Sequence, residues 1–251
     1  MSDSSTLRAL YLERMGIEVW RPRVVLGERP ATQSVPEAPV SVVADGASAM
    51  VPTQPTEVEV DMPSAAAPSD SWEALQEEVS GCTRCKLCQS RTQTVFGVGS
   101  TTARVVVIGE GPGAEEDRRG EPFVGPAGKL LDNMLRAIGL ARDTVYIANI
   151  VKCRPPNNRD PEADEVEACD GYLQRQLALI EPELIVAVGR VAAQNLLKTE
   201  APLGRLRGDV HHYGSRRIPV VVTYHPAYLL RSPQEKARAW QDLKLVRRQL
   251  A

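Results

Sequence analysis

The feature that most constrains the fold is an alternation of short β-branched runs with helical stretches, which begins after Ser71. Four runs have the composition of buried strands, at 104–109 (RVVVIG), 144–149 (TVYIAN), 183–189 (ELIVAVG) and 218–224 (IPVVVTY). Helices are expected near 127–138, 162–180, 191–197 and 233–250. Apolar strands separated by helices are typical of a parallel sheet covered on both faces. The sequence therefore predicts a single α/β domain with a central parallel four-stranded sheet in three α/β/α layers.

Composition separates the first 70 residues from this domain. Segment 24–70 contains seven prolines, no aromatic residue and seven acidic residues against Arg29 alone. Such a segment buries too little apolar surface to offset the entropy of ordering it. We expect a short amphipathic segment over 1–23, a disordered acidic Pro/Ala/Ser-rich linker over 24–70 and the folded domain over 71–251. Residues 1–23 fit either a flap on the domain or a docking motif for a protein partner.

Charge and hydropathy limit the classes of partner. Residues 71–251 carry 25 Lys and Arg against 22 Asp and Glu, which permits a polyanionic partner without requiring one. No apolar stretch reaches the roughly 18 residues that a membrane span needs, and the first residues lack a signal-peptide core. We therefore expect no membrane association and a cytoplasmic location.

A glycine-rich stretch, GEGPGAEED over 109–117, follows the first predicted strand, where α/β sheets bind their ligands. Its glycines are spaced two apart, unlike a G-x-G-x-x-G fingerprint, and Pro112 lacks the amide that would face a phosphate. No Lys-Ser/Thr pair follows, and the acidic residues after Gly113 would repel a pyrophosphate. The stretch favours a flat, neutral base that approaches glycine backbone beside a carboxylate.

The cysteines indicate a second site. Cys82 and Cys85 form a C-x-x-C pair, and Cys153 and Cys169 lie far downstream. A cytoplasmic location argues against disulfides and leaves metal binding, redox chemistry or chance. Four thiolates suit zinc or a 4Fe-4S cluster, and their spacing does not choose between them.

Three segments resemble the signature segments of the family-4 uracil-DNA glycosylases, the iron-sulfur branch of the uracil-DNA glycosylase superfamily. They are 109–135 (GEGPGAEEDRRGEPFVGPAGKLLDNML), 146–161 (YIANIVKCRPPNNRDP) and 224–233 (YHPAYLLRSP), and the similarity spans about Trp72 to Leu250. The resemblance implies a structural 4Fe-4S cluster, whose ligands would be Cys82, Cys85, Cys153 and Cys169. Cys88 has no role in the family pattern but could replace one of them.

The resemblance also implies a uracil pocket. Phe123 would stack on the base, and such stacking is worth about 1–3 kcal/mol. Asn149 would pair with uracil O4 and N3–H through one donor and one acceptor, an arrangement that cytosine reverses. Glu110 and Gly111 would contact the base. The alternatives are a core phenylalanine and an asparagine that caps a turn.

For catalysis, the resemblance implies that His225 donates a hydrogen bond to uracil O2. Glu116 would position water and favour the sugar cation, with Asn158 as its helper, and Asp117 would hold the loop. The other histidines, His211 and His212, are expected as a surface pair between strands. DNA contacts are expected from Lys129, Arg154, Arg159, Arg231 and Ser232, with Leu230 entering the groove.

These expectations describe a monofunctional uracil-DNA glycosylase. It would flip uracil out of single- or double-stranded DNA, hydrolyse the N-glycosidic bond and leave an abasic site. We expect a monomer that associates with the nucleoid through DNA. Segment 117–123 lacks the histidine of covalent superfamily members, and no lysine is placed for a lyase step. The alternatives are a non-catalytic iron-sulfur nucleic-acid-binding module, which would tolerate the loss of Glu116 and His225, and an iron-sulfur electron carrier.

Overall fold

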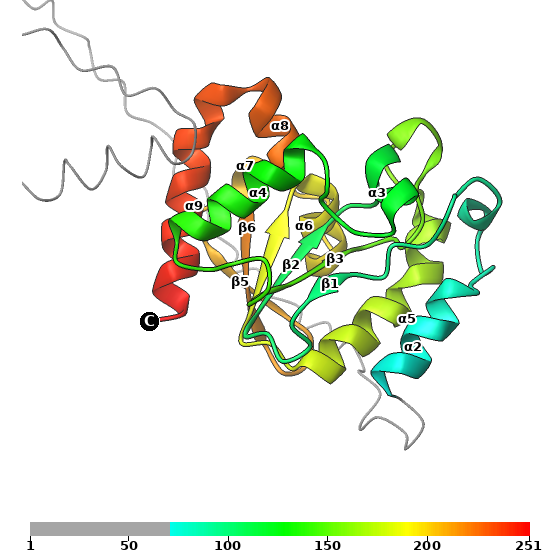
Figure 1. Cartoon of the computed structure of the whole chain (residues 1–251). Helices are drawn as coiled ribbons and strands as arrows, with labels where there is room; N and C mark the ends of the chain where they lie inside the picture. The colour runs from blue at the N-terminus through cyan, green and yellow to red at the C-terminus, as the bar shows by residue number, and fades with distance from the viewer. Residues whose placement is uncertain (1–70) are drawn as a thin grey trace, which may run out of the picture.

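The structure is a computed structural model that describes residues 71–251 (Figure 1). The predicted segments 1–23 and 24–70 lie outside the described residues. The strands are β1 (Val98–Gly99), β2 (Val105–Gly109), β3 (Tyr146–Asn149), β4 (Leu184–Val188), β5 (Val210–Tyr213) and β6 (Ile218–Thr223). The helices are α2 (Trp72–Ser80), α3 (Ala114–Arg119), α4 (Pro126–Ala137), α5 (Ala163–Ile180), α6 (Arg190–Leu197), α7 (Leu203–Leu206), α8 (Pro226–Arg231) and α9 (Lys236–Gln249). Short 3₁₀ helices are η1 (Lys86–Gln89), η2 (Pro156–Asn158) and η3 (Pro233–Glu235).

The sheet is mixed and larger than the sequence predicts. Its strand order is β1-β3-β2-β4-β6-β5, and the four predicted strands are its parallel centre. The edge strands β1 and β5 are antiparallel to their neighbours, so the prediction of four parallel strands is wrong in its extent. Strand β1 has only two residues, and β5 reads VHHY, so neither shows a continuous apolar run. His211 and His212 therefore lie within an edge strand and not between strands.

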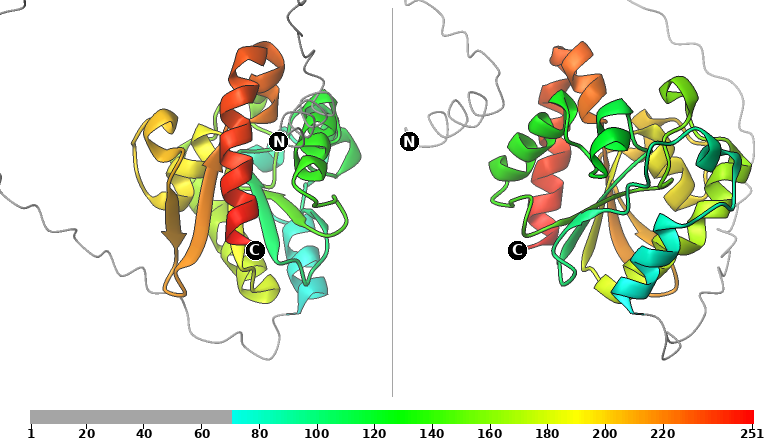
Figure 2. Two further views of the ribbon diagram at one scale, coloured as in Figure 1. Left: turned by 90° about the vertical axis from the view of Figure 1, so that its left-hand side faces the viewer. Right: turned by 45° about the vertical axis from the view of Figure 1, so that its right-hand side comes forward.

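Side-chain alternation along the central strands builds a core on each face of the sheet. Val106 and Ile108 of β2 pack in the core with α2, α5 and α6, whereas Val105 and Val107 pack in the core with α4 and α9. In Figure 1, α4 and α9 lie to the left of the sheet and α2 and α5 to its right, and Figure 2 gives two further views of these layers. The three-layer α/β/α arrangement is confirmed.

The predicted helices are present within a few residues of their expected ends, as α4, α5, α6 and η3 with α9. Sequence reasoning missed α2, α3, α7 and α8. Three of these have only four to six residues, too few for a helical period to show. None of the helices in residues 71–251 combines the length and apolar character that a membrane span requires.

Strand register brings the loops of the predicted site to one edge. Gly109 pairs with Asn149 at the ends of β2 and β3, and Val188 pairs with Thr223 at the ends of β4 and β6. Each of these strands is followed by residues that the sequence singled out. The carboxyl edge of the parallel strands is therefore where side chains from distant segments meet.

Candidate active site

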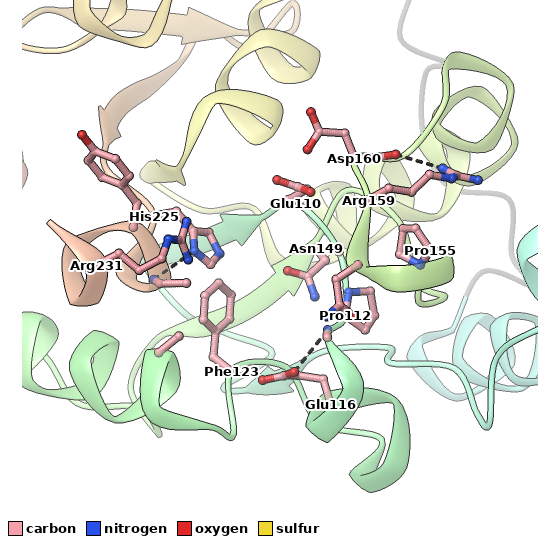
Figure 3. Close-up of a pocket in the computed structure, with 16 residues that line it drawn as sticks. Glu110, Pro112, Glu116, Phe123, Asn149, Pro155, Arg159, Asp160, His225 and Arg231 are labelled. Carbon is pink, nitrogen blue, oxygen red and sulfur yellow. Dashed lines mark hydrogen bonds between the residues drawn. The ribbon is translucent and has the colours of Figure 1, made fainter.

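A cavity of about 430 Å³ opens at this edge of the sheet. Phe123, Asn149 and His225 project toward a common space in it, from a loop, a strand end and the start of a helix (Figure 3). The predicted residues that line the cavity are Glu110, Gly111, Glu116, Phe123, Asn149, Asn158, Arg159, His225 and Arg231. Asp160 and Tyr228 also line it, and sequence reasoning did not single them out.

The glycine that ends β2 allows the closest approach in the site. A Cβ at Gly109 would lie 2.5 Å from Asn149 Oδ1 and 2.7 Å from Phe123 Cζ. Real Cβ atoms do not tolerate such distances, so any side chain at 109 would displace Asn149 or Phe123. Gly109 therefore leaves room for the side chains of Asn149 and Phe123, and it does not form part of a phosphate-binding turn.

The Phe123 loop is held in an unusual conformation. Phe123 has φ 53°, in the left-handed region, yet its side chain is only 6% exposed. Arg142 donates to the carbonyl oxygens of Pro122 and Phe123, and the carbonyl of Phe123 lies against Gly128 of α4. The Phe123 ring lies 5.5 Å from the His225 ring, centroid to centroid, at 30°. Arg142 therefore holds the backbone of the Phe123 loop without lining the cavity, and no motif signals that role.

Asn149 has an acceptor without a partner. The residue is 2% exposed, and within the described residues Asn149 Oδ1 is a buried oxygen that accepts no hydrogen bond. Leaving a buried polar atom unpaired costs about 1–3 kcal/mol, so this oxygen is available to accept a hydrogen bond from a donor that enters the cavity. The same amide carries two N–H donors, which gives the pocket an adjacent donor and acceptor. A turn cap would satisfy its own oxygen, so the binding role fits better.

His225 is neutral and has a defined tautomer. Its pKa is lowered to about 4, chiefly by burial and then by the charge of Arg231, while Glu116 partly opposes the shift. The amide N–H of Ala227 donates to His225 Nδ1 at 3.1 Å. Because Nδ1 accepts, the proton of the neutral ring is on Nε2. His225 can therefore offer one N–H donor to a ligand in the cavity.

Glu116 is the most firmly held carboxylate of the cavity. Its Oε2 accepts from the Gly113 amide at 3.1 Å and its Oε1 accepts from the Val124 amide at 3.1 Å. The first contact caps α3, and the second joins α3 to the Phe123 loop. Asp117, 4% exposed, accepts from the Thr92 amide at 2.9 Å and so joins α3 to the segment that precedes β1. Asn158 Oδ1 accepts from Arg154 Nε at 2.8 Å.

Glu110 and Asp160 form a pair of carboxyl groups on the wall opposite Phe123 (Figure 3). The pKa of Glu110 is raised to about 7, chiefly by burial and then by the neighbouring Asp160, while Arg190 opposes the shift. Asp160 forms an ion pair with Arg190 at the start of α6. Glu110 is therefore partly protonated near neutral pH.

The residues that are predicted to contact DNA differ in their solvent exposure and in whether another side chain already binds them. Arg231 is exposed at the cavity rim, and Lys129 is exposed on α4, outside the cavity. Arg159 also lines the cavity, but both its terminal nitrogens bind the buried Glu165, at 2.8 and 2.6 Å. Arg154 and Ser232 do not line it. These DNA contacts remain predictions.

The cysteines converge away from the cavity. Cys82, Cys85, Cys88, Cys153 and Cys169 line one small hollow between η1, α5 and the segment after β3, and no carboxylate or imidazole of residues 71–251 lines it. Within residues 71–251, no group of three or more His, Cys, Asp or Glu side chains is close enough to hold a metal ion as it stands. Burial raises the pKa of Cys153 to about 11 and also raises that of Cys169.

Basic side chains surround these thiols. Arg91 Nη1 donates to Cys153 Sγ at 3.0 Å, and Arg84 and Lys152 also line the hollow. Sulfur donors alone, surrounded by cations, suit an anionic thiolate-bound metal centre. The chemistry of the donor set therefore fits the predicted ligands, and Cys88 lines the same hollow. Sequence reasoning missed Arg91, although it follows the cysteine pair closely in the chain.

Together, the sheet and its cavity define a class: an α/β protein with a cavity at the carboxyl edge of its parallel strands, lined by an aromatic ring, a strand-end asparagine and a histidine. The family model of the uracil DNA glycosylase superfamily matches residues 96–244. The chain belongs to this superfamily and, within it, to the type-4 branch. It is 45% identical over 183 residues to the type-4 uracil-DNA glycosylase of Archaeoglobus fulgidus, covering 70% of this chain and 92% of the relative. The corresponding protein of Sulfurisphaera tokodaii is 45% identical over 185 residues (71% and 84%), and that of Thermotoga maritima is 44% identical over 168 residues (66% and 86%).

Proposed function

We propose that the protein excises uracil from DNA by hydrolysing its N-glycosidic bond, and that the cavity around Phe123, Asn149 and His225 is the active site. The observation that carries the proposal is the unpaired Oδ1 of Asn149, which lies against Gly109 within reach of the Phe123 ring. Uracil N3–H is the donor that this oxygen needs, and uracil O4 accepts from the same amide. Cytosine would leave Oδ1 facing an acceptor, so it is rejected.

The reaction separates charge, and the site is arranged to stabilise both products. As the bond from uracil N1 to C1′ breaks, its electron pair stays on uracil and the sugar becomes cationic. The neutral His225 ring donates its Nε2–H to uracil O2, where negative charge develops, without needing to transfer the proton. Glu116 faces the cavity with both oxygens already aligned by backbone amides, so its charge favours the sugar cation at little cost in reorganisation.

Water completes the reaction. Its oxygen bonds to C1′, and the proton that it loses passes through solvent to the departing uracil anion, so the products are an abasic site and neutral uracil. The free lone pairs of the Glu116 carboxylate orient this water, with Asn158 as a second polar group on the cavity wall. No lysine lines the cavity within residues 71–251, in keeping with a reaction that stops at the abasic site.

We further propose that Cys82, Cys85, Cys153 and Cys169 hold a 4Fe-4S cluster of structural function. Bound there, the cluster would join the segment that follows α2 to the segment after β3 and to α5. Arg91 would offset part of its negative charge. Lys129, Arg154, Arg159, Arg231 and Ser232 are proposed contacts to DNA. We place the protein in the cytoplasm as a monomer bound to DNA.

The test is uracil release from single- and double-stranded oligonucleotides, followed by alkali. Strand scission that appears only after alkali is expected for the wild-type protein. Asn149→Ala and His225→Ala should each reduce release by at least 100-fold, about 2.7 kcal/mol or more in the barrier. His212→Ala is the matched control, because it removes an exposed imidazole from β5. Binding of uracil DNA with no release would favour the non-catalytic module.

A further inference from the structure

An exposed tyrosine lies on the rim of the proposed active site. His225, Tyr228 and Arg231 follow one another at three-residue intervals along α8, and all three line the cavity. Tyr228 is 38% exposed, whereas most large apolar side chains of the described chain are buried. It therefore lies on the same helix face as the proposed catalytic histidine, one turn further along.

The ring of Tyr228 is held by a column of stacked groups. Tyr224 stacks beneath it, with centroids 5.3 Å apart and planes at 27°. The Arg207 guanidinium lies 4.1 Å from the Tyr224 centroid. Arg207 is fixed in turn by the buried Asp242, through contacts of 2.7 and 3.0 Å. One ring face of Tyr228 is covered by Tyr224, so its exposed area belongs to the other face and the ring edge.

A rim aromatic has a specific use when one base is extruded. The cavity takes the flipped base, and the neighbouring nucleotides stay outside it on the same strand. In a duplex their bases remain stacked on the helix, whereas in single-stranded DNA they lose that stacking. A preorganised aromatic face recovers it, for any base, because every base has a π-face.

On the basis of the proposed function, we propose that Tyr228 is a stacking subsite for the base of the nucleotide next to the extruded uracil in single-stranded DNA. The ligand is a nucleobase, and any of the DNA bases can take this place. The neighbouring Arg231 is placed for the phosphate that joins this nucleotide to uracil. The subsite supplies affinity for the strand and takes no part in bond breaking.

The experiment is a double-mutant cycle between the ring and the base. Uracil release is measured below saturation on a single-stranded oligonucleotide with normal neighbours, and on one whose two neighbours of uracil lack bases. For the wild-type protein, removing the bases should lower kcat/KM by about 5- to 150-fold. Tyr228→Ala should show the same loss on the normal strand and no further loss on the baseless one. Tyr228→Phe keeps the ring and should behave as wild type.

If the reductions in kcat/KM from Tyr228→Ala and from base removal multiply, the ring and the base act independently and the proposal is overturned. A reduction in kcat/KM for Tyr228→Phe as large as that for Tyr228→Ala would also overturn it. Equal activity of Tyr228→Ala and wild type on the baseless strand shows that the variant is folded and catalytically intact. Absence of release from every substrate would refute the proposed function itself. Those two failures are therefore distinguishable.

Discussion

At the scale of single residues, the protonation state of His225 decides the acid side of the activity profile. Burial, followed by Arg231, lowers its pKa to about 4, and the Glu116 carboxylate only partly opposes them. We therefore expect no loss of single-turnover uracil release from a histidine titration between pH 7 and about 5. An acid limb centred near the ordinary histidine value, about 6.5, would contradict the neutral-donor role. Nitrogen NMR of the imidazole should report Nε2–H throughout this range.

Ionisation of Glu110 is expected to set the alkaline limb of the pH profile of uracil release. Its pKa is raised to about 7 by burial first and by Asp160 second, with Arg190 opposing. As the pH rises through 7, Glu110 ionises and adds a negative charge to the cavity in which uracil must leave as an anion. Release should therefore slow toward pH 8.5, and Glu110→Gln should flatten that limb because the amide does not ionise. A limb unchanged in Glu110→Gln would assign the transition to another group.

Sequence reasoning at this scale found the residues whose chemistry a motif announces. Phe123, Asn149, His225 and Glu116 line one cavity, as expected from the loops that carry them. It missed residues that act by position alone. Arg142 holds the Phe123 loop from a distant turn, and such contacts depend on tertiary packing that no local pattern encodes.

At the scale of elements, Gly128 connects α4 to the site. Alanine is favoured over glycine within a helix by about 1 kcal/mol, so propensity alone predicts that Gly128→Ala stabilises the protein. A Cβ there would lie 1.7 Å from the Phe123 carbonyl oxygen, so the loop must move, and that overlap outweighs the propensity. We expect a lower free energy of unfolding in urea and loss of uracil release.

Gly171 in α5 provides the matched control, because a Cβ there meets nothing within 4 Å. Gly171→Ala should raise the free energy of unfolding by up to about 1 kcal/mol and leave uracil release unchanged. A Gly128→Ala variant that behaved like Gly171→Ala would show that the Phe123 loop does not depend on its contact with α4.

Strands were predictable where both faces of the strand are buried, because such strands appear in the sequence as continuous apolar runs. Strands β2 and β4 are examples. Edge strands and one-turn helices lack that signal. Strand β5 places two adjacent histidines between partly buried Val210 and Tyr213, and α8 begins at Pro226 and has only six residues, too few to show a helical period. Two short helices that carry residues of the cavity, α3 and α8, are therefore among the elements that sequence periodicity does not reveal.

At the scale of the whole molecule, the two sites share one short stretch of chain. Asn149 ends β3 in the cavity, and Cys153 faces the thiol hollow. Between them Lys152, 1% exposed, donates to the Asn149 carbonyl at 3.0 Å and to Gln176 Oε1 at 2.6 Å. Anchoring Cys153 therefore also helps to hold Asn149, the residue that we propose reads the base.

This connection predicts how loss of a cysteine propagates. Cys153→Ser should abolish the visible absorption of a bound iron-sulfur cluster and lower the melting temperature, by about 2–4 °C for each 1 kcal/mol lost. It should also weaken uracil release, because Asn149 loses its anchor. Cys88→Ser is the control from the same hollow and should keep colour, melting temperature and release if the ligands are Cys82, Cys85, Cys153 and Cys169. Colour lost in Cys88→Ser but kept in one of those four would reassign the ligand set, whereas a colourless wild-type protein that retains stoichiometric zinc would replace the cluster by zinc.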